Sequence, residues 1–393
     1  MSISSNRAGL TIEQFAPIVS AEFRTGVAGF LAPVAGTTRP AAPEVRPYTS
    51  WHDFAYEFRA GRAWRTDTWR PDELVWSAVQ GYFANGGVIC YVAFYDPAGT
   101  GDPLQALDHA LEALSTIDDV DLVCAPSVMA SADPLATQRK LIESSEAWRR
   151  ARFAQWFLIL DAPESQADVE AWLPELRLGC DRPYDIALYH PWLIPGGDWE
   201  PAPDATATSI PPCGHVAGIY ARSDRRVGVH KPPANEEIIG VVDVASDVAE
   251  IATANAILAM PGRGIRVWGA RTLAVTTTPA DPFAFVNMRR LLLTLERWLV
   301  RAFEWVTFET NDFRLWVRIH RELEDKLTQL FQAGAFAGKS PSEAFRIKCD
   351  EENNSADARA NGVLQVDVDV APAVPQQFIK IRLVRSAGVL AVA

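Results

Sequence analysis

Apolar strand-like segments alternate with helix-like segments between residues 72 and 191, and this alternation constrains the fold more than any other feature of the sequence. The predicted strands cover residues 88–95, 120–126, 156–163 and 184–191. The predicted helices cover residues 72–85, 103–114, 134–153 and 166–176. Mostly apolar strands that alternate with helices are typical of a parallel sheet covered on both faces. We therefore expect an α/β fold with a mostly parallel sheet, to which residues 26–34 add a strand.

The last third of the chain has a different pattern, in which two amphipathic helices precede several strands. Helices are predicted over residues 287–306, where Asn287 is the expected N-cap, and over residues 313–334. The strands that follow cover residues 345–350, 363–370 and 378–385. The first two of these strands are separated by a polar turn and should form a hairpin. This part of the chain is expected to be a separate α+β domain.

The composition argues against several classes of partner. The net charge of -12 and the pI of about 5.1 are unfavourable for binding nucleic acid or an anionic membrane surface. No run approaches the roughly 20 apolar residues of a membrane span, and the first residues lack the apolar core of a signal peptide. The five cysteines stand singly, as in proteins of a reducing compartment. A cytoplasmic protein is expected.

The stretch "PPCGHVAGIYARSDRRVGVHKPPANEEI" holds the side chains that most resemble a chemical site. A zinc site would need Cys213, His215 and His230, but their spacing matches no common ligand pattern. Ser127 directly follows a predicted strand, but no Gly-x-Ser-x-Gly turn surrounds it. Residues 261–269 contain glycines without the Lys-Ser/Thr of a phosphate-binding loop. We expect no metal, no cofactor and no catalytic group, and a loop-and-strand joint over residues 211–238.

The two final strands carry opposite charges on their polar faces. In residues 363–370, Gln365, Asp367 and Asp369 face one way, and in residues 378–385 Lys380 and Arg382 alternate with apolar residues. If the strands pair, each opposite-charge pair contributes about 0.2–1 kcal/mol and fixes the register. The pairing can be a hairpin within one chain or a strand added to a neighbouring copy. The pattern leaves both arrangements open.

Several segments resemble the contractile tail sheath proteins of phage tails and phage-tail-like injection systems. Five segments occur in the order typical of that family: the joint stretch quoted above, "MPGRGIRVWGARTL", "FVNMRRLLLTLERW", "FETNDFRLWVRI" and "FQAGAFAGKSPSEAFRIKCD". The earlier "FRTGVAGFLAPV" and "VQGYFANGGVICYVAFY" are also similar to it. The resemblance covers nearly the whole chain.

The resemblance implies a structural protein without enzymatic activity. It implies a subtilisin-like α/β body without catalytic residues over 21–255, a C-terminal domain over 256–374, and terminal arms at 1–20 and 375–393. The arms would be exchanged between copies through Ile12, Glu13, Ile379, Lys380, Ile381 and Arg382, and received by Gln365, Asp367 and Asp369. A hydrolase on the same α/β body is the alternative.

The resemblance also implies partners and a mechanical role. Rings of copies, six per ring in the family, would stack around an inner tube between a baseplate and a tail terminator, in a particle assembled in the cytoplasm. The second C-terminal helix carries Arg314, Arg318 and Arg321 on one stripe, which would face the tube. A solvated helix face is the simpler interpretation, and Arg289 and Arg290 on the preceding helix are the alternative tube-facing residues.

Overall fold

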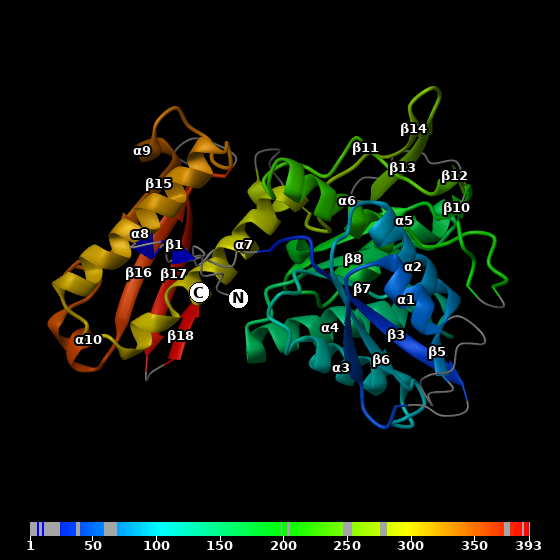
Figure 1. Ribbon diagram of the computed structural model, residues 1–393, viewed down its shortest axis with the longest axis horizontal. Helices are drawn as coiled ribbons and strands as arrows, with labels where there is room; N and C mark the ends of the chain where they lie inside the picture. The colour runs from blue at the N-terminus through cyan, green and yellow to red at the C-terminus, as the bar shows by residue number, and fades with distance from the viewer. Residues whose placement is uncertain are drawn as a thin grey trace.

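The computed structural model describes residues 6–7, 10–11, 24–36, 40–58, 69–197, 199–202, 205–246, 254–275, 281–372, 378–386 and 389–392. The chain forms an α/β body and a C-terminal α+β domain, and helix α7 (Val286–Ala302) runs from one to the other (Figure 1). Within the described ranges, no helix has the length and apolar character that crossing a bilayer requires.

A ten-stranded sheet forms the centre of the body. Its strands lie in the order β11 (Glu236–Glu237), β14 (Gly264–Val267), β13 (Asn255–Met260), β9 (Ile186–His190), β8 (Phe157–Asp161), β7 (Leu122–Cys124), β3 (Ala28–Gly36), β6 (Cys90–Tyr95) and β4 (Glu44–Tyr48), and β5 (Trp69–Pro71) pairs with β3. The run from β6 to β13 is parallel, and the strands added at both edges are antiparallel. This confirms the predicted mostly parallel α/β sheet.

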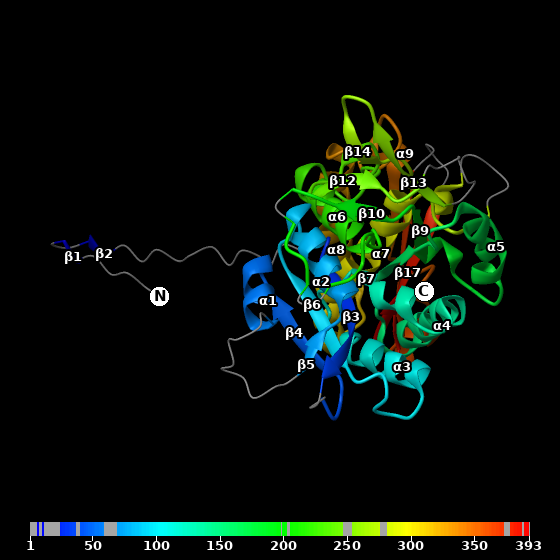
Figure 2. The ribbon, with the colours of Figure 1, turned by 90° about the vertical axis from the view of Figure 1, so that its right-hand side faces the viewer.

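Helices cover both faces of this sheet (Figure 2). One face carries α1 (Trp51–Phe58), α2 (Glu73–Ala84) and α6 (Cys213–Arg226), and the other carries α3 (Pro103–Leu114), α4 (Pro134–Arg152) and α5 (Gln166–Arg177). In β3, Phe30 packs into the first core and Leu31 into the second, and both are buried. Burial on both faces explains why the central strands are apolar throughout. Short 3₁₀ turns η1 (Pro126–Ala130), η2 (Pro183–Asp185) and η3 (Pro282–Ala284) join the elements.

Helix α6 corrects the expectation of a loop-and-strand joint, because it occupies half of that stretch. Its glycines allow close contact with α2: a Cβ on Gly214 would lie 2.2 Å from the carbonyl oxygen of Ala78. Its first turn has no capping side chain of its own. The cap comes from Asp161 at the end of β8, which accepts a hydrogen bond from the amide of Cys213 at 2.7 Å.

The C-terminal domain contains a four-stranded antiparallel sheet, β15 (Phe345–Lys348), β16 (Leu364–Val370), β17 (Ile379–Ser386) and β18 (Val389–Val392). Helices α7 and α8 (Phe313–Gln332) share its apolar core. The 3₁₀ turn η4 (Glu304–Phe308) joins these helices, and α9 (Pro341–Ala344) and α10 (Ala356–Ala360) flank β15. The predicted hairpin of β15 with β16 is confirmed, and β18 is an additional strand.

The start of the C-terminal domain and the N-cap of α7 differ from the expectation. Strands β13 and β14 belong to the main sheet of the body, although the C-terminal domain was expected to begin at residue 256. Asn287 is not the N-cap of α7, because Phe285 occupies that position. The Asn287 side chain instead donates to the carbonyl oxygen of His230 at 2.7 Å, which fastens α7 to the segment that follows α6.

Two smaller antiparallel pairs complete the described chain. Strand β10 (Leu193–Pro195) pairs with β12 (Val241–Val244), and β1 (Asn6–Arg7) pairs with β2 (Leu10–Thr11). The expected N-terminal exchange strand begins in β2. Its proposed exchange residues, Ile12 and Glu13, lie outside the described residues.

Candidate assembly interface

Strands β16 and β17 pair within one chain in the register that matches their charges. Asp367 lies opposite Arg382, and Asp369 lies opposite Lys380. The Arg382 Nε atom is 2.7 Å from Asp367 Oδ1, and the Lys380 Nζ atom is 3.7 Å from Asp367 Oδ2 and 3.9 Å from Asp369 Oδ1. Burial alone would raise the pKa of Asp367, but the hydrogen bond and charge of Arg382 outweigh it and lower the pKa. We call these four residues the charged ladder.

The other face of the same strands is apolar and covers the core of the domain. Val366 and Val368 of β16 and Ile381 and Leu383 of β17 are buried in it. Gln365, the remaining residue of the expected receiving strand, donates from its amide to Asp367 at 3.2 Å. The ladder therefore joins two strands whose apolar faces are already committed to the core, which fixes the register from both sides.

Arg385 at the end of β17 anchors this strand to η4. Its Nη1 atom donates to the carbonyl oxygens of Val306 at 2.6 Å and Glu309 at 2.8 Å. The side chain is buried, and its charge stabilises the carbonyl groups at the end of the turn. Arg385 thus belongs to the inner face rather than to the charged ladder.

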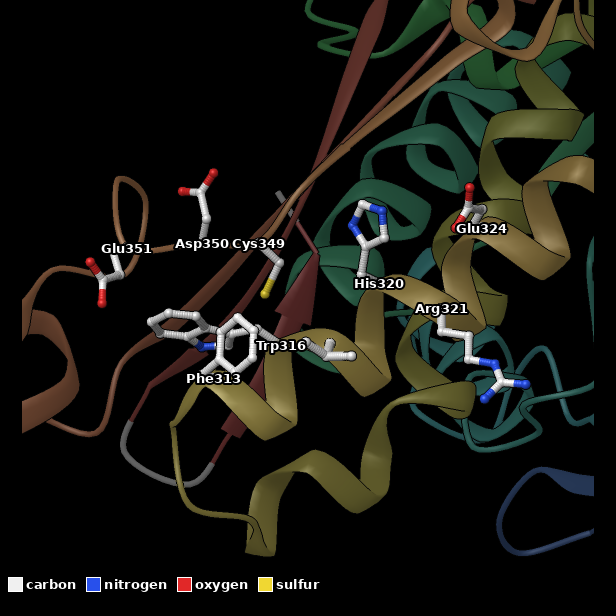
Figure 3. Close-up of a pocket in the computed structure, with 9 residues that line it drawn as sticks. Phe313, Trp316, His320, Arg321, Glu324, Cys349, Asp350 and Glu351 are labelled. Atoms are coloured by element: carbon white, nitrogen blue, oxygen red, sulfur yellow. The ribbon is translucent and has the colours of Figure 1, made fainter.

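The arginine stripe of α8 is not uniform. Arg314, Arg318 and Arg321 are all exposed, and the guanidinium of Arg318 also lies 3.6 Å from the centre of the Trp305 ring and 3.6 Å from Glu309. Arg318 is therefore held by its own domain. Arg321 lies at the edge of a surface hollow of about 520 Å³, shown in Figure 3.

Helix α7 is fastened to the body by buried arginines. Arg289 forms an ion pair with Asp185, and Arg290 reaches Asp121 at 3.0 Å and Asp224 at 2.6 Å. Both arginines are almost completely buried. Their burial rules them out as the alternative tube-facing residues. Arg297, two turns further on, donates to the carbonyl oxygens of Asp118 at 3.0 Å and Asp119 at 3.1 Å.

These contacts were missed at the level of sequence, although a signal was present. Arg290 and Arg297 lie seven positions apart in α7 and share one face of the helix with the apolar residues Val286 and Leu293. A cation on the apolar side of a helix needs a buried acidic or carbonyl partner. That requirement predicts contacts with another part of the chain, but it does not identify the part.

The side chains considered for zinc binding have structural roles. His215 is buried in α6, where its ring stacks on Trp199 at 5.2 Å, and burial lowers its pKa to about 3. Cys213 opens α6 against Asp161, whose pKa burial raises to about 7. Burial lowers the pKa of His230, and its neighbour Lys231 binds Glu236 at 2.7 Å. Across the residues that the structure describes, no group of three or more His, Cys, Asp or Glu side chains is placed to hold a metal ion.

Family models and curated relatives point to one family. Residues 99–273 match the model of the phage tail sheath protein central domain, and residues 278–384 match that of the phage tail sheath C-terminal domain. The chain is 27% identical over 174 residues to the tail sheath protein of Salmonella phage ViI, which covers 42% of this chain. It is 26% identical over 185 residues to that of Vibrio phage KVP40, which covers 44% of this chain. The chain spans about a quarter of the length of these relatives, since the matches cover 26% of each.

Solved structures match over nearly the whole chain. The helical sheath of the anti-feeding prophage in its contracted state has a TM-score of 0.67 and 25% identity, with 95% of this chain and 98% of that chain covered. The sheath complex of the extracellular contractile injection system PVC, also contracted, has a TM-score of 0.67 and 24% identity, with coverage of 95% and 96%. The two family models together match most of the chain, and this chain belongs to the contractile tail sheath family.

Proposed function

We propose that this protein is the subunit of a contractile sheath, which polymerises helically around an inner tube and contracts to drive the tube through a target envelope. The charged ladder between β16 and β17 is the observation that carries the proposal. It lies in the four-stranded sheet of the C-terminal domain, where one strand could be exchanged between copies.

Exchange of β17 between copies conserves every contact of the ladder. A neighbour's Lys380 and Arg382 would meet Asp369 and Asp367 in the same register as the chain's own residues do. The apolar contacts of Ile379 and Ile381 would likewise be reproduced. Domain swapping of this kind links subunits at low cost in free energy. In the proposal, a second link comes from the N-terminal arm through Ile12 and Glu13.

The proposed organisation follows from these links. Arms at 1–20 and 375–393 flank an α/β body that extends to Leu273 and a C-terminal domain that begins with α7. Exchanged strands hold the copies together while side-chain contacts change during contraction, because each backbone hydrogen bond between paired strands contributes about 0.5–1.5 kcal/mol. The free energy released by contraction was stored at assembly, so no nucleotide is needed.

The inner tube is the proposed partner of α8. Arg314 and Arg321 are exposed on this helix and would face an acidic tube surface, with Arg318 held beside them. Exposed ion pairs are worth about 0–1 kcal/mol each, which lets contraction release the tube. We also propose six copies per ring, contacts with a baseplate and a tail terminator, and assembly in the cytoplasm.

A hydrolase on the same body is the rival function. We propose that the body has a subtilisin-like topology without the catalytic residues and that the protein has no enzymatic activity. Ser127, the serine considered as a nucleophile, is buried in η1, and the joint histidine His215 is buried in α6 against Trp199. These environments support a structural role for both.

Electron microscopy of the purified protein tests the proposal. The full chain should form sheath-like tubes, and a chain lacking residues 378–393, whose α/β body should remain folded, should not form them. Circular dichroism of the truncated chain provides the control for folding. Normal tubes from the truncated chain, or a uniform monomer with hydrolase activity from the full chain, would contradict the proposal.

A further inference from the structure

A surface hollow in the C-terminal domain has an apolar floor and an acidic rim. Its floor contains the rings of Phe313 and Trp316 at the start of α8, with Val317 beside them. Phe313 is 71% exposed and Val317 is 51% exposed, so the floor presents adjoining apolar surface to solvent. The rim carries Glu324 of α8 and, after β15, Asp350 and Glu351, and these three carboxylates outnumber the single cation Arg321 at its edge, so we call this feature the acidic hollow (Figure 3).

One end of the α/β body carries positive charge, in contrast to the acidic hollow. Five cations, Arg222, Arg226, Lys231, Arg263 and Arg266, lie there around the carboxylates of Glu236 and Glu237. We call this cluster the basic end. Its positive charge contrasts with the net charge of -12 of the whole chain.

The hairpin of β13 and β14 projects from this basic end (Figures 1 and 2). Its turn consists of Pro261, Gly262 and Arg263, all exposed, next to the partly exposed Met260. Arg263 and Arg266 are both held by Asn235, at 3.0 Å and 2.6 Å respectively, so the tip is fixed to its base. The hairpin therefore presents an apolar tip and positive charge on a braced support.

We propose that the basic end of one copy docks into the acidic hollow of a second copy, with the tip of the β13–β14 hairpin on the aromatic floor. The acidic rim matches the cations of the hairpin in charge, and the apolar floor suits Met260 and Pro261. The two surfaces lie on different domains of the chain (Figure 1). Contacts between different surfaces of identical copies repeat from one copy to the next, which produces rings or helical filaments.

This inference deepens the proposed function and rests on it, because it assumes that copies assemble. It names a contact that is separate from the exchanged strands. The β13–β14 hairpin and α8 contribute no residue to the pairing of β16 with β17. Variants at this contact therefore leave the exchanged strands intact.

Cross-linking of assembled particles tests the contact, because the hollow already contains a cysteine, Cys349. The variant Pro261→Cys places a second thiol at the hairpin tip. A short bismaleimide should join Pro261→Cys of one copy to Cys349 of the next and give a ladder of oligomers on a denaturing gel. Burial raises the pKa of Cys349 to about 12, so the reaction needs prolonged incubation.

The matched control is Pro261→Cys combined with Cys349→Ser, which should abolish the series of cross-linked oligomers on the gel. Three outcomes would each overturn the inference: cross-linked oligomers that persist in this control, a cross-link to the tube protein in place of a second copy, or no cross-link in well-formed particles. Two results together would refute this contact and still support strand exchange. The chain carrying Pro261→Cys would form normal particles without the cross-link, and the chain lacking residues 378–393 would form no particles.

Charge reversal gives an independent measurement. Arg263→Glu, or Glu324→Lys with Glu351→Lys, should lower the yield of sedimenting particles on the order of tenfold, and the combination should restore it. Arg150→Glu and Glu143→Lys on α4 lie on neither surface and should have little effect. Equal yields for the reversed variants and these controls would overturn the inference.

Discussion

Arg290 of α7 lies between two aspartates of the body, with its guanidinium 3.0 Å from Asp121 and 2.6 Å from Asp224. Asp121 also accepts hydrogen bonds from the backbone amides of Gly26 at 3.0 Å and Val27 at 2.6 Å, where the chain enters β3. One buried guanidinium thus connects the C-terminal domain, helix α6 and the first strand of the body. The subunit is built to keep α7 and the body together as one unit.

The variant Arg290→Met should lower the free energy of unfolding by about 3–5 kcal/mol, because it leaves two buried carboxylates without their cation. Denaturant unfolding followed by tryptophan fluorescence measures this change. The control Arg301→Met removes an exposed contact with Asp119 and should cost about 0–1 kcal/mol. Equal effects of the two variants would show that the buried contact does not hold α7 to the body.

His215 should make the fold sensitive to acid. Its pKa is lowered to about 3 in the folded chain, against an ordinary value of 6.5. Between these values the unfolded chain binds the proton more tightly, so the stabilising effect of a neutral His215 is lost as the pH falls from 6.5 towards 3. The loss should reach on the order of 3–5 kcal/mol.

The variant His215→Phe keeps a ring against Trp199 and removes this titration. The slope of unfolding free energy against pH between 6.5 and 4 should decrease by up to about 1.4 kcal/mol per pH unit, whatever the change in absolute stability. Asp161, whose pKa is raised to about 7, contributes the opposite slope between 3.8 and 7 and is unchanged in the variant. An identical slope in both proteins would show that His215 is not held neutral by the fold.

The arginines of α8 should determine whether the sheath holds a tube. Replacing Arg314 and Arg321 with Glu leaves Arg318 on Trp305 and reverses the charge at the other two positions of the stripe. We expect such a sheath to polymerise in the contracted, tube-free form alone, as seen by electron microscopy of co-expressed sheath and tube. Extended particles filled with tube would show that another surface binds the tube.

The layered body and the strands of the C-terminal hairpin were predictable, because their apolar periodicity reflects local burial. The order of strands in the sheet was not, and neither was α6. This helix is capped by Asp161, 52 positions earlier in the chain, and its glycines pack against α2. Strand β13 escaped prediction because it mixes buried and exposed residues in a short segment.

In the candidate sites, too, local patterns could be predicted and contacts between distant parts of the chain could not. The acidic face of residues 363–370 and the basic face of residues 378–385 were expected from alternation within two strands, which is a local pattern, and the structure gives the residue pairs. The burial of Arg290 depends on Asp121 and Asp224, which come from distant parts of the chain. Sequence reasoning located the charges in both cases but identified their partners only where the partners lay on adjacent strands.

Mixing two variants tests the exchange of β17 most directly. One carries Lys380→Glu and Arg382→Glu, and the other carries Asp367→Lys and Asp369→Lys. A chain with all four changes controls for folding of the reversed ladder and should assemble. Each two-residue variant alone should form few tubes, because like charges oppose each other across the ladder.

When the two variants are mixed, each chain can give its β17 to the other with opposite charges aligned. We expect tubes that contain both chains in equal amounts, with the tubes counted by electron microscopy and the chains quantified by mass spectrometry. If β17 stays within its own chain, mixing restores nothing. A mixture that forms no more tubes than either variant alone, while the four-residue variant assembles, would contradict strand exchange.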